Sequence, residues 1–252
     1  MPLILPPRLT ASARVLRDTA RRRGLPTVQL PDHGVPEGLR APEAHLHAGP
    51  AFADAVASAL GVAPLEAPAD WLARLPAAFV QREIRAMPIR EAYGLRRPAF
   101  VKSPNDKSIP ALVYTDGSRL PGPDAVDPET TVLVSDIVAF EAEYRLHLLD
   151  GRVHTGSRYA TAGRLDLGPL SASARTFASE VLGAVGDTLP SAIVVDVGVV
   201  DPGRWAVIEA NAAWASGFYA ADPDRALDVV LRAAGPAASL PERDGHFVRR
   251  VA

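Results

Sequence analysis

Two apolar segments near the C-terminal end constrain the fold of this chain more than any other feature. They are Ile193–Val200 and Trp205–Ala210, and the four residues between them are DPGR. Val-rich and Ile-rich segments on either side of a Pro-Gly pair indicate a β-hairpin with its turn at residues 202–203. Because the turn fixes which residues pair across a hairpin, a loop centred there places Asp196 directly opposite Glu209.

This acidic pair is unfavourable unless a cation lies beside it. Asp196 and Glu209 would be like charges on neighbouring strands, and Asn211 would share the face of Glu209 because side chains alternate along a strand. Carboxylates among apolar residues lose hydration, which costs several kcal/mol per ion. Carboxylate and amide oxygens suit a hard cation such as Mg²⁺ that binds together with substrate phosphates. The alternative is a register slipped by one residue, in which the acids face water.

The composition excludes several classes of protein. The chain has 252 residues, 48% of them hydrophobic, which is enough for one large compact unit or a few small ones. A net charge of −2 and a pI of about 6.3 predict no nucleic-acid partner and no anionic membrane surface. The absence of cysteine excludes disulfides and thiolate chemistry. No segment approaches the ~20 apolar residues of a membrane span, and the N-terminal apolar run is too short for a signal peptide. We therefore expect a cytoplasmic protein.

Lysine is concentrated in one short stretch. Of the 27 basic residues only two are lysines, Lys102 and Lys107, and both lie in the sequence FVKSPNDKS. A general preference for arginine explains the other positions but not the proximity of these two. A lysine ammonium is a compact point charge that suits a single phosphate oxygen. The stretch is therefore a candidate phosphate-binding segment, and the alternative is a coincidence on a solvated loop.

The order of predicted elements divides the chain into three parts. Residues 1–75 begin with a strand, a helix and a strand, which is typical of a small α/β unit. Residues 76–138 combine a helical stretch over Pro76–Tyr93 with later strands, and residues 139–252 hold two hairpins, two helices and a polar tail, Pro236–Ala252, that we expect to be loose. No GxxxxGK or GxGxxG motif is present, which excludes a P-loop protein and a simple dinucleotide binder.

A second hairpin is predicted upstream of the acidic one. Residues 143–149 and 152–160 flank Asp150-Gly151, the strongest short hairpin signal in the chain. A turn centred there places Glu143 opposite Arg158. One face of the first strand is then polar, and its members are Glu143, Arg145 and His147. A functional face and an ordinary solvated face of an antiparallel sheet would look alike at this point.

Three features now stand in one order along the chain. Lys102 lies on a predicted strand with Lys107 five residues on, a second strand contains VSDIV and leads to EYR, and Asp196 precedes Glu209-x-Asn211 on a hairpin. This order resembles the ATP-grasp superfamily, whose members include D-alanine–D-alanine ligase and glutathione synthetase. The resemblance covers the whole chain. It implies an α/β (α+β) fold in which a small N-terminal α/β domain precedes two lobes that clasp ATP, here the second and third parts of the chain.

The resemblance also assigns nucleotide-binding roles. Lys102 resembles the family lysine that contacts the α- and β-phosphates, and Lys107 resembles the second phosphate lysine, on the loop that closes over the nucleotide. Either Glu141 or Glu143 would hold the ribose hydroxyls. The hinge whose backbone binds adenine corresponds to Ser135, Asp136, Ile137 and Val138.

The same resemblance implies a metal site and substrate contacts. Asp196, Glu209 and Asn211 would bind one or two Mg²⁺ ions, with Glu209 as the bridge, and Arg145 would stabilise the transferring phosphate. The candidate substrate residues are Arg158 for a carboxylate, and Trp214, Ser216 and Tyr219 for the acceptor. The alternative role of these last three residues is packing between the lobes.

Two features depart from the family pattern. The expected phosphate-covering loop, SPNDKS, lacks the glycines that many members have there, and the chain is short for the superfamily. We expect an ATP-dependent ligase that joins a carboxylate to an amine through an acyl phosphate, with ATP and Mg²⁺ as cofactors. Its substrates would be a small amino acid or peptide, and a homodimer is a possible assembly. A small-molecule kinase and a nucleotide-sensing protein without turnover remain the alternatives.

Overall fold

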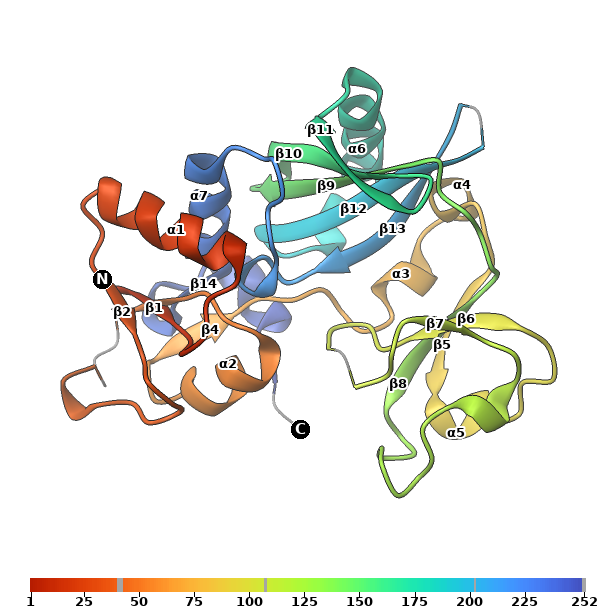
Figure 1. The fold of residues 1–252 in the computed structure, drawn as a ribbon, viewed down its shortest axis with the longest axis horizontal. Helices are drawn as coiled ribbons and strands as arrows, with labels where there is room; N and C mark the ends of the chain where they lie inside the picture. The colour runs from red at the N-terminus through yellow and green to blue at the C-terminus, as the bar shows by residue number, and fades with distance from the viewer. Residues whose placement is uncertain (40–42, 107, 202, 251–252) are drawn as a thin grey trace.

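A five-stranded antiparallel sheet forms the centre of the structure, a computed structural model that describes residues 1–39, 43–106, 108–201 and 203–250 (Figure 1). Its strands lie in the order β11-β10-β9-β12-β13, so the two predicted hairpins join through the pairing of β9 with β12. The strands are β9 (Ala142–Leu149), β10 (Arg152–Thr161), β11 (Arg164–Pro169), β12 (Ala192–Asp201) and β13 (Arg204–Asn211).

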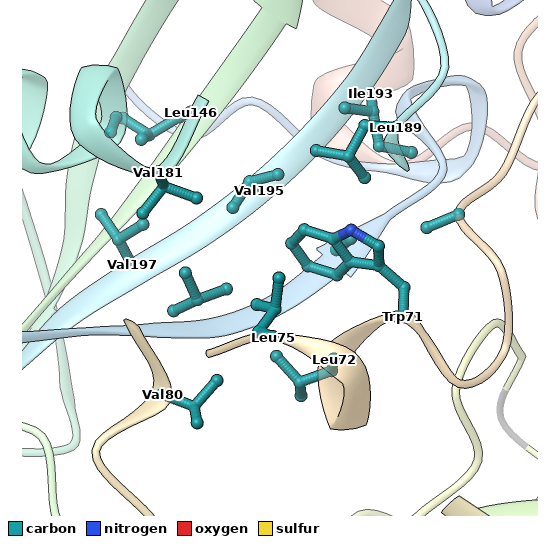
Figure 2. Close-up of a cluster of buried hydrophobic side chains, with 14 of the residues drawn as sticks. Trp71, Leu72, Leu75, Val80, Leu146, Val181, Leu189, Ile193, Val195 and Val197 are labelled. Atoms are coloured by element: carbon teal, nitrogen blue, oxygen red, sulfur yellow. The ribbon is translucent and has the colours of Figure 1, made fainter. Parts of the chain in front are cut away.

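Helices cover both faces of this sheet. On one face, α6 (Ala172–Val185) and the short helices α3 (Trp71–Arg74) and α4 (Ala77–Val80) pack against odd-numbered residues of β12 such as Val195 (Figure 2). On the other face, α7 (Pro223–Ala233) packs against even-numbered residues of the same strand. Each buried Val or Leu side chain contributes about 1.5–3 kcal/mol, so burial on both faces holds β12 in the middle of the fold.

An N-terminal α/β unit packs against α7. Its three parallel strands lie in the order β2-β1-β3, and α1 connects β1 to β2 and contacts α7. The Thr10 hydroxyl caps α1 by accepting a hydrogen bond from the Ala13 amide at 3.1 Å. The elements are β1 (Leu3–Leu5), α1 (Ala11–Arg22), β2 (Thr27–Gln29), β3 (His45–Leu46), α2 (Pro50–Val56) and β4 (Val62–Pro64), which pairs with β14 (Ala234–Pro236).

A smaller antiparallel sheet lies to one side of the central sheet (Figure 1). Its order is β5-β8-β6-β7, and it has its own apolar core, in which Ile89 of the short helix α5 is completely buried. The elements are β5 (Ile84–Pro88), α5 (Ile89–Ala92), β6 (Ala99–Lys102), β7 (Leu112–Tyr114) and β8 (Thr131–Ser135). Single turns of 3₁₀ helix complete the fold: η1 (Glu37–Leu39), η2 (Gly117–Arg119), η3 (Gly186–Thr188), η4 (Ala213–Ala215), η5 (Ala237–Ser239) and η6 (Glu242–Phe247).

Two expectations from the sequence are wrong. The stretch Pro76–Tyr93 is not one helical segment, because Ile84–Pro88 pairs along its whole length with β8. The tail from Pro236 is not loose in its described part, since Asp244 and Phe247 are buried there. No helix in the described ranges is both long and apolar enough to cross a membrane.

The two hairpins differ in how well the sequence predicted their register. In β12–β13, Asp196 pairs with Glu209 as expected, although two one-residue irregularities, which cancel each other, lie between this pair and the turn. In β9–β10 the turn at Asp150-Gly151 has positive φ at both residues and is the predicted two-residue turn. Two irregularities then shift the register in the same direction, so Arg158 pairs with Tyr144 and not with Glu143.

Candidate functional site

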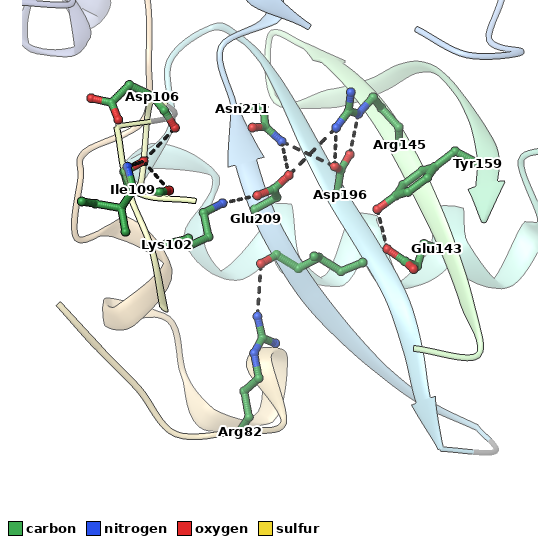
Figure 3. Close-up of polar contacts among 12 residues, drawn as sticks. Arg82, Lys102, Asp106, Ile109, Glu143, Arg145, Tyr159, Asp196, Glu209 and Asn211 are labelled. Carbon is green, nitrogen blue, oxygen red and sulfur yellow. Dashed lines mark hydrogen bonds and ion pairs between the residues drawn. The ribbon is translucent and has the colours of Figure 1, made fainter. Parts of the chain in front are cut away.

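The predicted acidic pair lies at the centre of a buried polar cluster. Asp196 is completely buried, and Glu209 on the neighbouring strand has a quarter of its side chain exposed. The Asn211 amide nitrogen lies 2.7 Å from Glu209 Oε1 and 3.4 Å from Asp196 Oδ2 (Figure 3). The hairpin therefore brings all three predicted metal-ligating side chains together on one face of the sheet.

Two cationic side chains neutralise the acids. Arg145 lies opposite Asp196 on β9 and donates two hydrogen bonds to it, from Nε at 2.9 Å and from Nη2 at 2.6 Å. Lys102 reaches across from β6 of the smaller sheet and pairs with Glu209 (Figure 3). The sequence argument required positive charge beside the acids, and the structure supplies it with one residue from each sheet.

The burial of the cluster shifts its proton affinities. Burial raises the pKa of Asp196 to about 6 against the opposing effect of Arg145, so the carboxylate is still charged at pH 7. Burial would also raise the pKa of Glu209, but Lys102 and Asn211 outweigh it and hold that pKa below its ordinary value. The pKa of Arg145 lies above its usual range because Asp196 overcomes the cost of burial. The cluster thus contains two carboxylates and two cations at neutral pH.

A pair of tyrosines covers Arg145. The rings of Tyr159 and Tyr219 stack with centroids 4.8 Å apart, and the Arg145 guanidinium carbon lies 5.0 Å from the Tyr219 centroid. Tyr159 donates a 2.6 Å hydrogen bond to Glu143, while Tyr219 has a backbone φ of 51°, a region that is strained for a non-glycine residue. The predicted ribose ligand Glu143 and the predicted transfer arginine are therefore linked through one phenol.

A cavity of about 260 Å³ lies between the two sheets. The predicted hinge, residues 135–138, lines it together with Glu143 on one side and the Lys102–Glu209 pair on the other. Its apolar walls are Phe100, Ala111, Val113, Phe140 and Ile208. An apolar cleft with exposed backbone at one end and cationic charge at the other matches the needs of a purine nucleotide.

A second cavity of about 320 Å³ lies beyond the same ion pair. It shares Lys102, Ala111 and Glu209 with the first cavity, so the two meet at the charged cluster. Small and apolar residues dominate its lining, with polar groups from Ser103, Asn105, Asp106, Asn211 and Ser216. The arrangement can hold two ligands whose reacting ends meet beside Lys102.

The remaining predicted residues are distributed unevenly around the two cavities. Lys107 lies outside the described residues. Glu141 is exposed and does not line the nucleotide-sized cavity, whereas Glu143 does. Arg158 forms an ion pair with Asp166 of β11 at 3.0 Å. Its predicted substrate role stays a prediction, as does the division of the chain at residues 75 and 138.

The predicted acceptor residues separate into two kinds. Trp214 is fully buried and donates a hydrogen bond to the Leu65 carbonyl at 2.8 Å, so its indole is part of the core. Ser216 lines the second cavity, and Tyr219 is partly exposed above Arg145. The alternative of packing therefore describes Trp214, and only the other two lie where a ligand could reach them.

The sequence argument missed Arg82, which lines the nucleotide-sized cavity. The irregularity in β13 leaves two successive carbonyls unpaired, and Arg82 donates to both, to Val207 at 2.9 Å and to Ile208 at 3.1 Å. Burial lowers the pKa of Arg82 to about 10, so the guanidinium remains charged at pH 7. The sequence carries no signal for this role, because it depends on a strand bulge more than a hundred residues away.

The cluster suits Mg²⁺ only when a ligand supplies further oxygens. In the described parts of the chain, no group of three or more His, Cys, Asp or Glu side chains could hold a metal ion. Two carboxylates and one amide are nevertheless a donor set that suits Mg²⁺ bound jointly with phosphates. The donor chemistry thus fits a metal that arrives with a nucleotide, and it does not form a complete protein cage.

Comparison with known families identifies the fold. The model of an ATP-grasp domain family, the second family of its clade, matches residues 79–229, which is more than half of the chain. The chain belongs to the ATP-grasp superfamily. This part of the ATP-grasp chain contains the cluster, both walls of the nucleotide-sized cavity and the whole central sheet. A comparison with curated protein sequences gave no match.

Solved structures agree with this ATP-grasp fold. D-cycloserine synthetase DcsG is similar with a TM-score of 0.57 and 16% identity, and the match covers 96% of this chain and all of that one. D-alanine–D-alanine ligase from Bacillus anthracis is similar with a TM-score of 0.54 and 12% identity, covering 92% and 96% of the two chains. The RimK domain ATP-grasp protein from Sphaerobacter thermophilus has a TM-score of 0.50, 16% identity and coverage of 96% and 99%. At such identities the likeness establishes the fold alone.

Proposed function

We propose that this ATP-grasp protein is an ATP-dependent ligase that joins a carboxylate to an amine through an acyl phosphate. The observation that carries the proposal is the meeting of two cavities at Lys102 and Glu209. A nucleotide in one cavity and a small acid in the other would bring a γ-phosphate and a carboxylate together there. The similar solved structures include a synthetase and a ligase, which supports this class of reaction.

The nucleotide would lie in the 260 Å³ cavity between the proposed lobes, residues 76–138 and 139–252. The backbone of residues 135–138 would bind adenine, and the carboxylate of Glu143 would bind the ribose. Lys102 at the other end would contact the phosphates. Lys107 would add a second phosphate contact from its loop.

Binding of Mg²⁺ with the phosphates would rearrange the charged cluster. Lys102 would exchange Glu209 for phosphate oxygens, which frees both Glu209 oxygens for the metal. The Asn211 amide nitrogen faces the acids, so rotation of the amide by half a turn would present its oxygen instead. The metal would neutralise phosphate charge as that charge develops.

The chain's own residues would act mainly by positioning and by charge. Arg145 would stabilise the transferring phosphate, and Asp196 and the stacked tyrosines hold its guanidinium in place. Ser216 and Tyr219 would contact the acceptor, and Arg158 would bind a substrate carboxylate after release from Asp166. The second cavity is near the lower end of the size range of ligand pockets, which favours a small amino acid or a short peptide end.

Product analysis with a panel of acids and amines tests the proposal. ADP and phosphate release would be measured with amino acids and dipeptides, for the wild type and for Glu209→Gln. We expect release that needs both an acid and an amine, and that falls at least a hundredfold in the variant. Equal release by both proteins would refute the metal role. Mass spectrometry then separates a ligase, which forms an amide, from a kinase, whose product gains one phosphate.

A further inference from the structure

The C-terminal segment is attached to the centre of the molecule by a buried arginine. Arg249 donates to both oxygens of Asp54 on α2, at 2.7 and 3.0 Å, and to Glu66 at 2.7 Å. Only 12% of its side chain is exposed, and its guanidinium carbon lies 6.0 Å from the Trp214 ring centroid. One side chain therefore neutralises two carboxylates in a largely buried position.

The segment that Arg249 holds, residues 64–67, also contacts two parts of the candidate site. The Arg249 amide donates to the Pro64 carbonyl at 2.8 Å, and Leu65 bridges to Val248. The Leu65 carbonyl accepts from the Trp214 indole, which lies three residues after Asn211. The 64–67 segment therefore fixes the chain that leaves the metal-binding strand.

The second contact reaches the loop between Lys102 and Ile109. The Asn105 side chain donates to the Ala67 carbonyl at 2.8 Å, and it also hydrogen-bonds the Glu66 carboxylate. Asn105 lines the second cavity beside Lys102 and Glu209. A continuous chain of contacts thus leads from Arg249 through Glu66 to Asn105 at the phosphate-binding loop.

We propose that Arg249 is a positioning residue that sets the active-site end of the Lys102–Ile109 loop through Glu66 and Asn105. The inference rests on the proposed function, because it assigns the loop to nucleotide phosphates. Without Arg249, Glu66 would be a mostly buried carboxylate with no cation in contact. It would turn toward water or take up a proton, and either change alters its hydrogen bond with Asn105. The loop would then lose its attachment to the 64–67 segment.

A double-mutant cycle on Mg·ATP affinity tests this link. Arg249→Met and Asn105→Ala would each weaken Mg·ATP binding at least fivefold by calorimetry. The double variant would bind no more weakly than the weaker single variant, because both changes break the same connection. Arg250→Met is the matched control, since Arg250 is the exposed next residue, and we expect its affinity to stay within twofold of the wild type.

Each other outcome has a defined meaning. Unchanged affinity in Arg249→Met with a lowered urea midpoint would show a purely structural role and overturn the inference, and so would additive losses in the double variant. If Arg249→Met fails to fold, Glu66→Gln replaces it in the same cycle, because it keeps the Asp54 ion pair and removes the charge that joins Arg249 to Asn105. A wild-type protein that binds no Mg·ATP would refute the proposed function itself, and the inference with it.

Discussion

Replacement of Asp196 by asparagine tests how strongly the buried ion pair supports the fold. Asp196 is completely buried and accepts two hydrogen bonds from Arg145, whose side chain is only 12% exposed. Asparagine keeps the size of the side chain but removes the charge. The Arg145 guanidinium would then remain charged in the core, with Glu209 at 4.0 Å as its nearest carboxylate.

The expected loss follows from the position of this pair. Removing one partner of a buried ion pair costs about 3–5 kcal/mol, because the other charge is left uncompensated. Glu209 and the Tyr219 ring still face Arg145, so the lower end of the range applies, about 3 kcal/mol. For a chain of this size the dependence of the unfolding free energy on urea is on the order of 3 kcal/mol per molar. The urea midpoint should therefore fall by about 1 M.

Urea unfolding at pH 7, followed by circular dichroism, measures this change. The matched control is Asp166→Asn, which breaks the partly exposed Arg158–Asp166 pair of the same sheet and should cost less than about 1 kcal/mol. A combined Arg145→Met and Asp196→Leu variant should recover most of the lost stability, because no buried charge remains. A loss in Asp196→Asn no larger than that of the control would refute the reasoning.

The other predictions concern pH and the nucleotide cavity. Burial lowers the pKa of His47 to about 4 and of His147 to about 3, so the unfolded chain binds protons below pH 6.5 that the folded chain does not. Stability should be full above pH 6.5 and fall toward pH 6 with a limiting slope of about 2.7 kcal/mol per pH unit; Asp196, whose pKa is raised, offsets part of this slope at lower pH, and a flat urea midpoint between pH 7 and 5.5 would contradict it. Ile137→Asp should weaken Mg·ATP binding at least tenfold by calorimetry, because it places a charge in the adenine wall, whereas Leu165→Asp on the exposed edge strand should leave it unchanged; equal effects would remove residue 137 from the site.

The acidic hairpin was predictable because its signals are local. A Pro-Gly turn and two Val-rich runs specify the strands, and the opposition of Asp196 to Glu209 follows from counting outward from the turn. The count succeeded only because two strand irregularities cancel. The same count failed for β9–β10, where the shifts accumulate and move Arg158 out of register with Glu143. Bulges depend on tertiary contacts, so counting from a turn cannot foresee them.

Residues whose roles depend on distant partners were not predictable. Arg82 serves carbonyls exposed by a bulge in β13, and Arg249 joins acids from two other segments of the chain. Trp214 follows the metal-binding strand closely enough to suggest a ligand contact, but the 64–67 segment buries it. The strand over Ile84–Pro88 was interpreted as helix because its alternation is weak and only its pairing with β8 reveals it.

Crystals grown with a non-hydrolysable ATP analogue and Mn²⁺ in place of Mg²⁺ test the central claim most directly. The account predicts an anomalous peak in contact with Glu209, Asp196 and the Asn211 amide oxygen, with the analogue's phosphates beside Lys102. A peak elsewhere, or Lys102 still paired with Glu209 while the analogue lies outside the cavity, would contradict it.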